Sequence, residues 1–190
     1  MAKTTTTAAR LREDYKKTLA SSIAKDLSIK NAHDVPKLEK VIVSVGLGKS
    51  QGDKRMFEVA TNTLTKITGQ APMHTIARKS IAGFKLREGS KIGMKVTLRG
   101  DRMYEFLDRM INIVIPRLRD FHGVSVKSFD GSGNYSVGFK EQSVFPELTF
   151  EDITTAHGIQ VTIVTDSDSD EKAQALLTAL GMPFEKKEAK

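Results

Sequence analysis

The chain has 190 residues, no cysteine and a formal net charge of +7 at pH 7. This length suits one domain with a substantial core, and the absence of cysteine excludes disulfides, thiolate metal sites and cysteine nucleophiles. Residues 1–7 lack the apolar segment of a signal peptide, and no run approaches the roughly 18 apolar residues of a membrane span, so we expect a cytoplasmic protein without membrane contact.

The first seventy residues predict a helix, a strand and a second helix. Residues 8–27 form the first helix, because apolar side chains recur there at the i, i+4 spacing of one helix face. A strand is predicted over residues 40–45, and Asp53 then caps a helix that Gly69 ends. The predicted buried faces are Leu11, Tyr15, Leu19, Ile23 and Leu27 in the first helix, and Met56, Phe57, Ala60, Leu64 and Ile67 in the second.

Residues 72–99 predict a hairpin, in which a short extended segment at 72–76 and a strand at 92–99 flank a long basic loop. A helix begins at Asp101, and Pro116 ends or kinks it because proline removes a backbone donor. Its predicted core side chains are Met103, Phe106, Leu107, Met110, Ile111 and Val114. Strands at 135–139 and 159–165 and a last helix at about 170–180 complete the predicted elements.

Strands mixed with helices, including at least one hairpin, predict an α+β fold. We expect a two-layer sandwich: a mainly antiparallel sheet with helices on one face and an open polar face. We expect residues 1–190 to form a single domain, with a flexible N-terminal extension at 1–9, a basic loop at 77–91 and a short charged C-terminal tail at 185–190.

The strand at 92–99 alternates strictly between two kinds of side chain. Ile92, Met94, Val96 and Leu98 point to one face, and Gly93, Lys95, Thr97 and Arg99 point to the other. The first face packs, whereas the second is polar and cationic. Antiparallel sheets often leave one face in water, and the cations favour RNA as a ligand over solvent alone.

The basic loop, "ARKSIAGFKLREGSKIG", has four cations in its first eleven residues, together with Gly83, Gly89 and one aromatic residue, Phe84. Lysine and arginine bind phosphates, glycines permit close backbone approach, and Phe84 can stack on an unpaired base. The alternative is a solvated loop with Phe84 tucked into the core. By contrast, residues 141–171 hold eight acids and no lysine or arginine, which indicates a face turned away from a polyanion.

Two short motifs resemble known binding loops but lack residues that those loops need. "VGLGKS", residues 45–50, lacks the first glycine of a phosphate-binding loop, because Val43 stands at that position. "DSDSDE", residues 166–171, has Glu171 where a calcium loop needs glycine, so helix capping is the simpler role for its acids. The four histidines lack paired ligand spacing. We therefore expect no enzyme activity, no cofactor and no metal.

Two longer segments resemble a known family. Residues 64–100, "LTKITGQAPMHTIARKSIAGFKLREGSKIGMKVTLRG", and residues 119–147, "RDFHGVSVKSFDGSGNYSVGFKEQSVFPE", are similar to the bacterial large-subunit ribosomal protein L5 family, which binds 5S ribosomal RNA in the central protuberance. The likeness extends from about Arg12 to Phe184. The resemblance implies a structural ribosomal protein of the large subunit.

The resemblance also implies particular contacts. The residues that would bind 5S RNA are Lys40, Ser44, Lys49, Gln70, Lys95, Thr97 and Arg99. The loop residues that would approach the elbow of transfer RNA in the peptidyl site (P site) are Arg78, Lys79, Ser80, Gly83, Phe84, Lys85 and Arg87. Further implied partners are other proteins of the central protuberance and, across an intersubunit bridge, a protein of the small-subunit head.

At the position of Ser44 the family usually has asparagine, and serine keeps a donor and an acceptor but has a shorter reach. The alternative function is a free-standing RNA-binding regulator with an RRM-like sheet. That class places paired aromatic residues on its central strands, where this chain has Lys95, Thr97 and Arg99.

Overall fold

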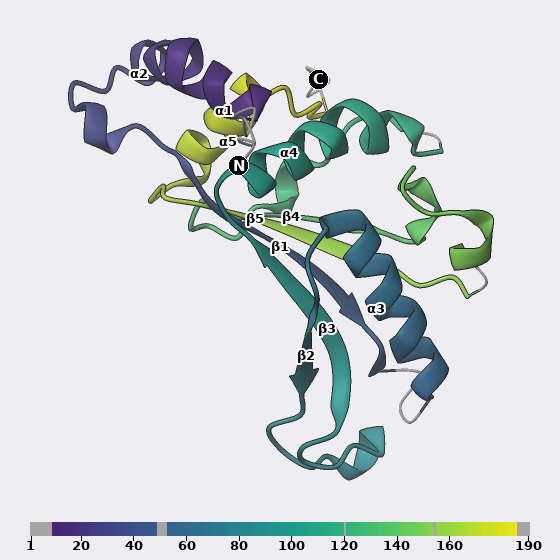
Figure 1. The fold of residues 1–190 in the computed structure, drawn as a ribbon. Coiled ribbons are helices and arrows are strands. Elements are labelled where there is room, and N and C mark those ends of the chain that lie inside the picture. Colours follow the sequence, from purple (N-terminus) through teal and green to yellow (C-terminus); the bar gives the residue numbers. More distant parts are fainter. Residues whose placement is uncertain (1–8, 49–52, 120, 154, 186–190) are drawn as a thin grey trace, which may run out of the picture. The chain divides into compact units, whose positions relative to one another are not determined.

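The chain forms an α+β fold with one five-stranded sheet (Figure 1). This computed structural model describes residues 9–48, 53–119, 121–153 and 155–185. The strands are β1 (Leu38–Gly46), β2 (Met73–Ile76), β3 (Lys91–Leu98), β4 (Tyr135–Phe139) and β5 (Ile159–Thr165), in the sheet order β2-β3-β1-β5-β4. The helices are α1 (Arg10–Asp14), α2 (Ala20–Asp26), α3 (Lys54–Thr68), α4 (Asp101–Arg109) and α5 (Asp170–Ala179). The predicted α+β two-layer class, with a mainly antiparallel sheet, is confirmed.

The described residues divide into two compact units. The first contains residues 9–40, 99–135 and 163–185, and the second contains residues 41–98 and 136–162. Helices α1, α2, α4 and α5 belong to the first unit, whereas α3, β2 and β3 belong to the second. The single domain, with its two flexible ends, stays a prediction, and most of those ends lies outside the described residues.

In the second unit, β1 and β3 pair antiparallel around a core of small and branched side chains. Val41, Val43 and Val45 lie opposite Leu98, Val96 and Met94, and all six are at most 2 % exposed. Helix α3 covers this face and contacts β3 (Figure 1). It contributes the fully buried side chains of Ala60, Leu64 and Ile67.

Helix α3 begins and ends where the sequence predicts. The Asp53 carboxylate accepts hydrogen bonds from the backbone N–H groups of Arg55, at 3.0 Å, and Met56, at 3.4 Å. These bonds satisfy donors that the helix itself leaves unpaired. At the other end, Gly69 takes a left-handed conformation, with φ of 68°, which glycine adopts without steric cost. Phe57, predicted to be buried, is only half-buried.

Strands β2 and β3 form the predicted antiparallel hairpin. Met73 pairs with Lys95, His74 with Met94 and Thr75 with Gly93, and a bulge interrupts the register between Thr75 and Ile76. The basic loop connects these two strands at the end of the sheet (Figure 1).

In the first unit, the predicted helix at 8–27 is interrupted. A π-helical turn, Tyr15–Leu19, separates α1 from α2, and only Leu11 and Ile23 of the predicted stripe are buried. A π turn inserts one residue into the helical repeat, so the face that points to the core changes along the helix. The Tyr15 hydroxyl donates a hydrogen bond to the Pro36 carbonyl at 2.8 Å, which keeps this partly exposed ring in place.

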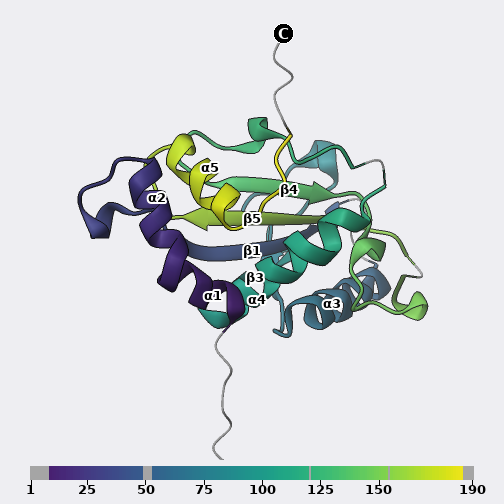
Figure 2. The same ribbon diagram turned by 90° about the horizontal axis from the view of Figure 1, so that it is seen from above.

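Two ion pairs and a buried helical face hold the first unit together. The Arg12 guanidinium lies 2.6 Å from the Asp101 carboxylate, and Arg10 lies 2.6 Å from Asp108, so α1 is bound to α4. Helix α2 contacts α5 (Figure 2). All six predicted core residues of the helix that begins at Asp101 are buried.

Among the described residues, no helix has both the length and the apolar character needed to cross a membrane.

Leu98→Ala is expected to lower the free energy of unfolding by about 2 to 5 kcal/mol, because it leaves a cavity in place of a core side chain that is 1 % exposed. Arg99→Ala, the matched control one residue further along, removes an exposed side chain with a surface ion pair and should cost less than about 1 kcal/mol. Urea unfolding of both variants measures the difference. A larger loss in Arg99→Ala would contradict the assignment of the two faces.

Candidate nucleic-acid interface

One face of β1 and β3 carries three of the side chains predicted to bind RNA. Ser44 lies opposite Lys95, and Ile42 lies opposite Thr97. Paired residues of an antiparallel ladder point to the same side, so these four share the face turned away from the buried valines. Lys95 is exposed, while Ser44 and Thr97 are half-buried. We define the open face as Ile42, Ser44, Gly46, Met73, Thr75, Gly93, Lys95 and Thr97.

Strand β2 adds Met73 and Thr75 to the open face, and sequence reasoning missed both. Met73 pairs with Lys95 and is 64 % exposed, whereas Thr75 pairs with Gly93. The sequence predicted only an extended segment at 72–76. A strand of four residues with mixed side chains contains too little alternation to indicate which residues face which side.

Gly93 lies in the middle of the open face, where no side chain projects from the sheet. A Cβ atom at this position would lie 2.5 Å from the Val45 carbonyl oxygen and 3.1 Å from the Thr75 hydroxyl oxygen. Both distances are shorter than normal van der Waals contact, so a side chain here would push the strands apart. Gly93 is itself buried, so the lack of a side chain lets β1, β3 and β2 pack closely at this point.

Gln70 lies beside β3 within the second unit. Its side-chain Nε2 donates a weak hydrogen bond to the Thr97 carbonyl at 3.5 Å, and its backbone N–H donates to the Thr68 hydroxyl at 3.3 Å. The turn that follows α3 therefore brings Gln70 next to Thr97, as expected for two residues of one site.

Lys40 and Arg99 belong to the first unit, where both contact one acid. Glu39 Oε1 lies 3.2 Å from Arg99 Nη1 and 3.4 Å from Lys40 Nζ. The hydrogen bond from Arg99, and then that from Lys40, holds the pKa of the Glu39 carboxyl below its usual range. Two cations facing one carboxylate leave a net positive charge. Sequence reasoning missed Glu39, because it placed the start of β1 two residues later.

Lys49, the remaining residue predicted to bind 5S RNA, lies outside the described residues. Of the motif "VGLGKS", the described part leaves the sheet at Gly46, and the buried Leu47 donates a backbone hydrogen bond to the Ile92 carbonyl at 2.9 Å. This bond holds the exit of β1 against β3. Pairing with β3 therefore continues one residue beyond β1, to Leu47.

The basic loop has defined internal structure. Ile81 and Leu86 exchange backbone hydrogen bonds at 2.9 and 3.1 Å, which makes the loop a small second hairpin on β2 and β3. At its base, the Ala77 N–H donates to the Ser90 carbonyl at 2.9 Å. The Ser80 hydroxyl accepts a bond from the Glu88 N–H at 2.9 Å, so this predicted site residue braces the loop.

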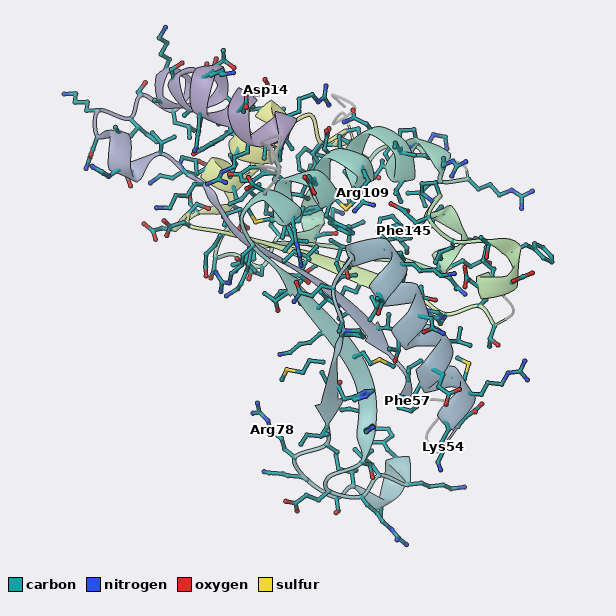
Figure 3. The ribbon with its side chains drawn as sticks, viewed as in Figure 1. Asp14, Lys54, Phe57, Arg78, Arg109 and Phe145 are labelled. Atoms are coloured by element: carbon teal, nitrogen blue, oxygen red, sulfur yellow. The ribbon has the colours of Figure 1, made fainter. Side chains whose placement is uncertain are left out.

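The cations and the aromatic ring of this loop face solvent. Phe84 is 72 % exposed at the tip, so the alternative that placed it in the core is wrong. Arg78, Lys79, Lys85 and Arg87 are all exposed, and within the described ranges none of them forms an ion pair. Figure 3 shows Arg78 pointing outward where the loop leaves β2. The loop therefore presents uncompensated positive charge.

Acids of the stretch 141–171 have structural partners within each unit. In the second unit, both carboxylate oxygens of Asp152 lie 2.7 Å from Lys66 Nζ, and this hydrogen bond, followed by those from Thr149, lowers the pKa of Asp152 to about 2. In the first unit, helix capping was the predicted role for the acids of residues 166–171. Asp170 instead accepts hydrogen bonds from the backbone N–H groups of Gly131 and Gly133, because that glycine turn folds over the start of the helix. No group of three metal-ligating side chains exists in the described part of the chain.

Comparison with known proteins gives one consistent result. Residues 31–87 match the family described as ribosomal protein L5, and residues 91–184 match the C-terminus of the same ribosomal family. The chain is 52 % identical over 176 residues to large ribosomal subunit protein uL5 of Prochlorococcus marinus (strain AS9601), covering 93 % of this chain and 98 % of the relative. It is 51 % identical over 177 residues to the protein of that name from Anaeromyxobacter sp. (strain Fw109-5), with the same coverage of each chain.

Glu39→Gln is expected to raise the affinity for a short single-stranded RNA about two- to five-fold at low salt, because it releases Arg99 and Lys40 from a competing carboxylate. Acid should act in the same direction, since protonation of Glu39 below its lowered pKa also removes the negative charge. Fluorescence anisotropy with a labelled octanucleotide measures the change. Glu105→Gln, the same substitution at an exposed position of α4, should have no comparable effect, and equal gains in both variants would refute a local role for Glu39.

Proposed function

Because the chain belongs to the ribosomal protein L5 family, a family of structural proteins of the large ribosomal subunit without enzyme activity, we propose that it binds 5S ribosomal RNA through the open face. We also assign to 5S RNA binding Lys40, which lies within β1, and Arg99, which directly follows β3. The sections of the chain that match the family include every residue assigned to this contact.

The observation that carries this proposal is the combination of groups on the open face. The Ser44 and Thr97 hydroxyls and the Gln70 amide offer donors and acceptors beside the exposed Lys95. Cations alone bind any phosphate backbone, whereas hydrogen-bonding groups at fixed positions discriminate by RNA shape and by the 2′-hydroxyl. This surface therefore suits one structured RNA.

The alternative, a free-standing regulator with an RRM-like sheet, is less well supported. Such sheets stack bases on aromatic side chains of the central strands. On β1 and β3 the corresponding described positions hold Ile42, Ser44, Lys95 and Thr97. A sheet of this kind recognises RNA by polar contacts and charge, so base stacking is not its main mode.

The basic loop is proposed to contact the elbow of P-site transfer RNA. Its small hairpin holds four exposed cations and Phe84 away from the core of the second unit. Because the loop is braced by its own hydrogen bonds, its charge pattern is set before RNA arrives, which lowers the entropy cost of binding. The proposed residues are Arg78, Lys79, Ser80, Gly83, Phe84, Lys85 and Arg87.

Protein partners are proposed on chemical grounds for the acidic stretch. Its eight acids without a lysine or arginine suit a basic neighbour, and Phe150 within it is 92 % exposed. We assign this surface to neighbours in the ribosome: other proteins of the central protuberance and, across an intersubunit bridge, a protein of the small-subunit head.

Arg99→Ala is expected to weaken binding of 5S RNA by about 1 to 3 kcal/mol, because it removes charge-assisted hydrogen bonds from a side chain outside the core. Lys16→Ala, which removes an exposed cation far from β3 in the sequence, is the control and should have little effect. A competition gel against a duplex of equal length measures affinity and preference together. Equal affinity of the wild-type protein for both RNAs would refute specific 5S binding.

Replacement of residues 79–88 by a short Gly-Ser linker is expected to leave 5S RNA incorporation unchanged and to weaken retention of P-site tRNA. Each phosphate interaction that the linker removes should reduce the slope of log affinity against log salt for tRNA by about 0.7 to 0.9. A salt series with reconstituted ribosomes measures both interactions. Loss of 5S RNA with unchanged tRNA retention would assign the loop to the 5S site instead.

A further inference from the structure

The second unit contains a cavity of about 580 Å³ on the helical side of its sheet. It lies between the first turns of α3 and the base of the β2–β3 hairpin, with Lys54, Phe57 and Glu58 on one wall and His74 and Lys91 on the other. Figure 3 shows Lys54 and Phe57 at the end of α3 that is nearest the basic loop. His74 pairs with the buried Met94, so the cavity and the open face, with Lys95, lie on opposite sides of β3.

Two aromatic rings form one part of the cavity wall. The ring centroids of Phe57 and His74 are 6.2 Å apart, and the ring planes meet at 63°, an edge-to-face arrangement. The Thr61 hydroxyl donates to the Phe57 carbonyl at 2.7 Å, which fixes the helix backbone beneath the first ring. Phe57 was predicted to be a core residue, but it is half-buried and lines this cavity instead.

Two lysines lie beside the cavity. Lys54 stands at the first position of α3, directly after Asp53, whose carboxylate accepts hydrogen bonds from the Arg55 and Met56 N–H groups. That carboxylate offsets the positive end of the helix dipole, so the lysines, rather than the helix terminus, supply positive charge here. Lys54 and Lys91 form no ion pair among the residues that the structure describes.

We propose that this cavity binds one unpaired RNA nucleotide. Lys54 and Lys91 attract its phosphate, and the Phe57 and His74 rings stack against its base. Glu58 would repel a phosphate, but its carboxylate accepts hydrogen bonds from the N–H groups of a base edge. The volume lies within the range of pockets for small ligands, and a single nucleotide fits it.

This contact is separate from the proposed 5S site. The two sites lie on opposite faces of β3, so one RNA segment on the open face leaves the cavity free for a second segment. Loss of the nucleotide site should not alter 5S binding, and loss of 5S binding should not alter the nucleotide site. The two proposals can therefore fail independently.

Titration of the full-length protein with 5′-nucleoside monophosphates and with a single-stranded RNA hexamer tests the proposal. Both probes should shift the NMR signals of Thr61 and His74, and the hexamer should bind more tightly. Phe57→Leu should weaken hexamer binding at least about five-fold because stacking is removed, with 5S affinity unchanged. Lys54→Gln should also weaken it, whereas Arg55→Gln, the same charge change one residue away and outside the cavity wall, should not.

Several results would overturn the proposal. Unshifted Thr61 and His74 signals would show that the cavity does not bind nucleotides, and equal losses in Lys54→Gln and Arg55→Gln would show only general attraction by the surface. Binding of monophosphates without the hexamer would identify a small-molecule site rather than an RNA site. An acidic peptide that displaced the hexamer and bound more tightly would identify a protein-binding site.

A photo-crosslinker in assembled ribosomes identifies the source of the nucleotide. His74→p-benzoylphenylalanine should crosslink to RNA, and primer extension distinguishes ribosomal RNA from tRNA, either of which supports the proposal. Crosslinks to protein alone would overturn it.

Discussion

The register between β1 and β3 is the constraint on which the second unit depends. With Val43 opposite Val96 and Ser44 opposite Lys95, one face of the ladder becomes core and the other becomes the open face. A shift by one residue would exchange these roles, exposing the valines and burying Lys95. Gly93 reinforces the pairing, because any side chain there would collide with the Val45 carbonyl oxygen. One alignment thus determines both which side chains form the core and which form the open face.

The charged side chains discussed above fall into two groups. Acids such as Asp152 and Asp170 are occupied by lysine or by backbone N–H groups within their own unit, so they stabilise local structure. The cations of the basic loop have no such partners in the described chain, and their mutual repulsion is relieved only by solvent or by a polyanion. Glu39 differs from both groups, because its one carboxylate is shared by Arg99 and Lys40 and compensates only part of their charge.

The sequence predicted structural features correctly where neighbouring residues alone determine them. Strict alternation in β3 predicted the two faces, and Asp53 and Gly69 predicted the ends of α3, because capping depends on a few neighbouring residues. The π-helical turn at Tyr15, the exposure of Met73 and the cavity beside Phe57 were not predicted. Each depends on packing or pairing between segments distant in sequence, and residue spacing carries no information about such partners. The likeness of long segments to a family, rather than any single motif, indicated the function.

The bulge in the β2–β3 pairing bears on how the exposed edge of the sheet avoids pairing with another chain. β2 is an edge strand, and its outer backbone groups, beside the exposed Met73 and Ile76, offer a template for another chain. This edge strand has only four residues, the extra residue of the bulge, Ile92 in β3, increases the local twist, and the adjoining loop carries exposed positive charge. A short, twisted edge beside like charges is one of the arrangements that disfavour edge-to-edge pairing of sheets.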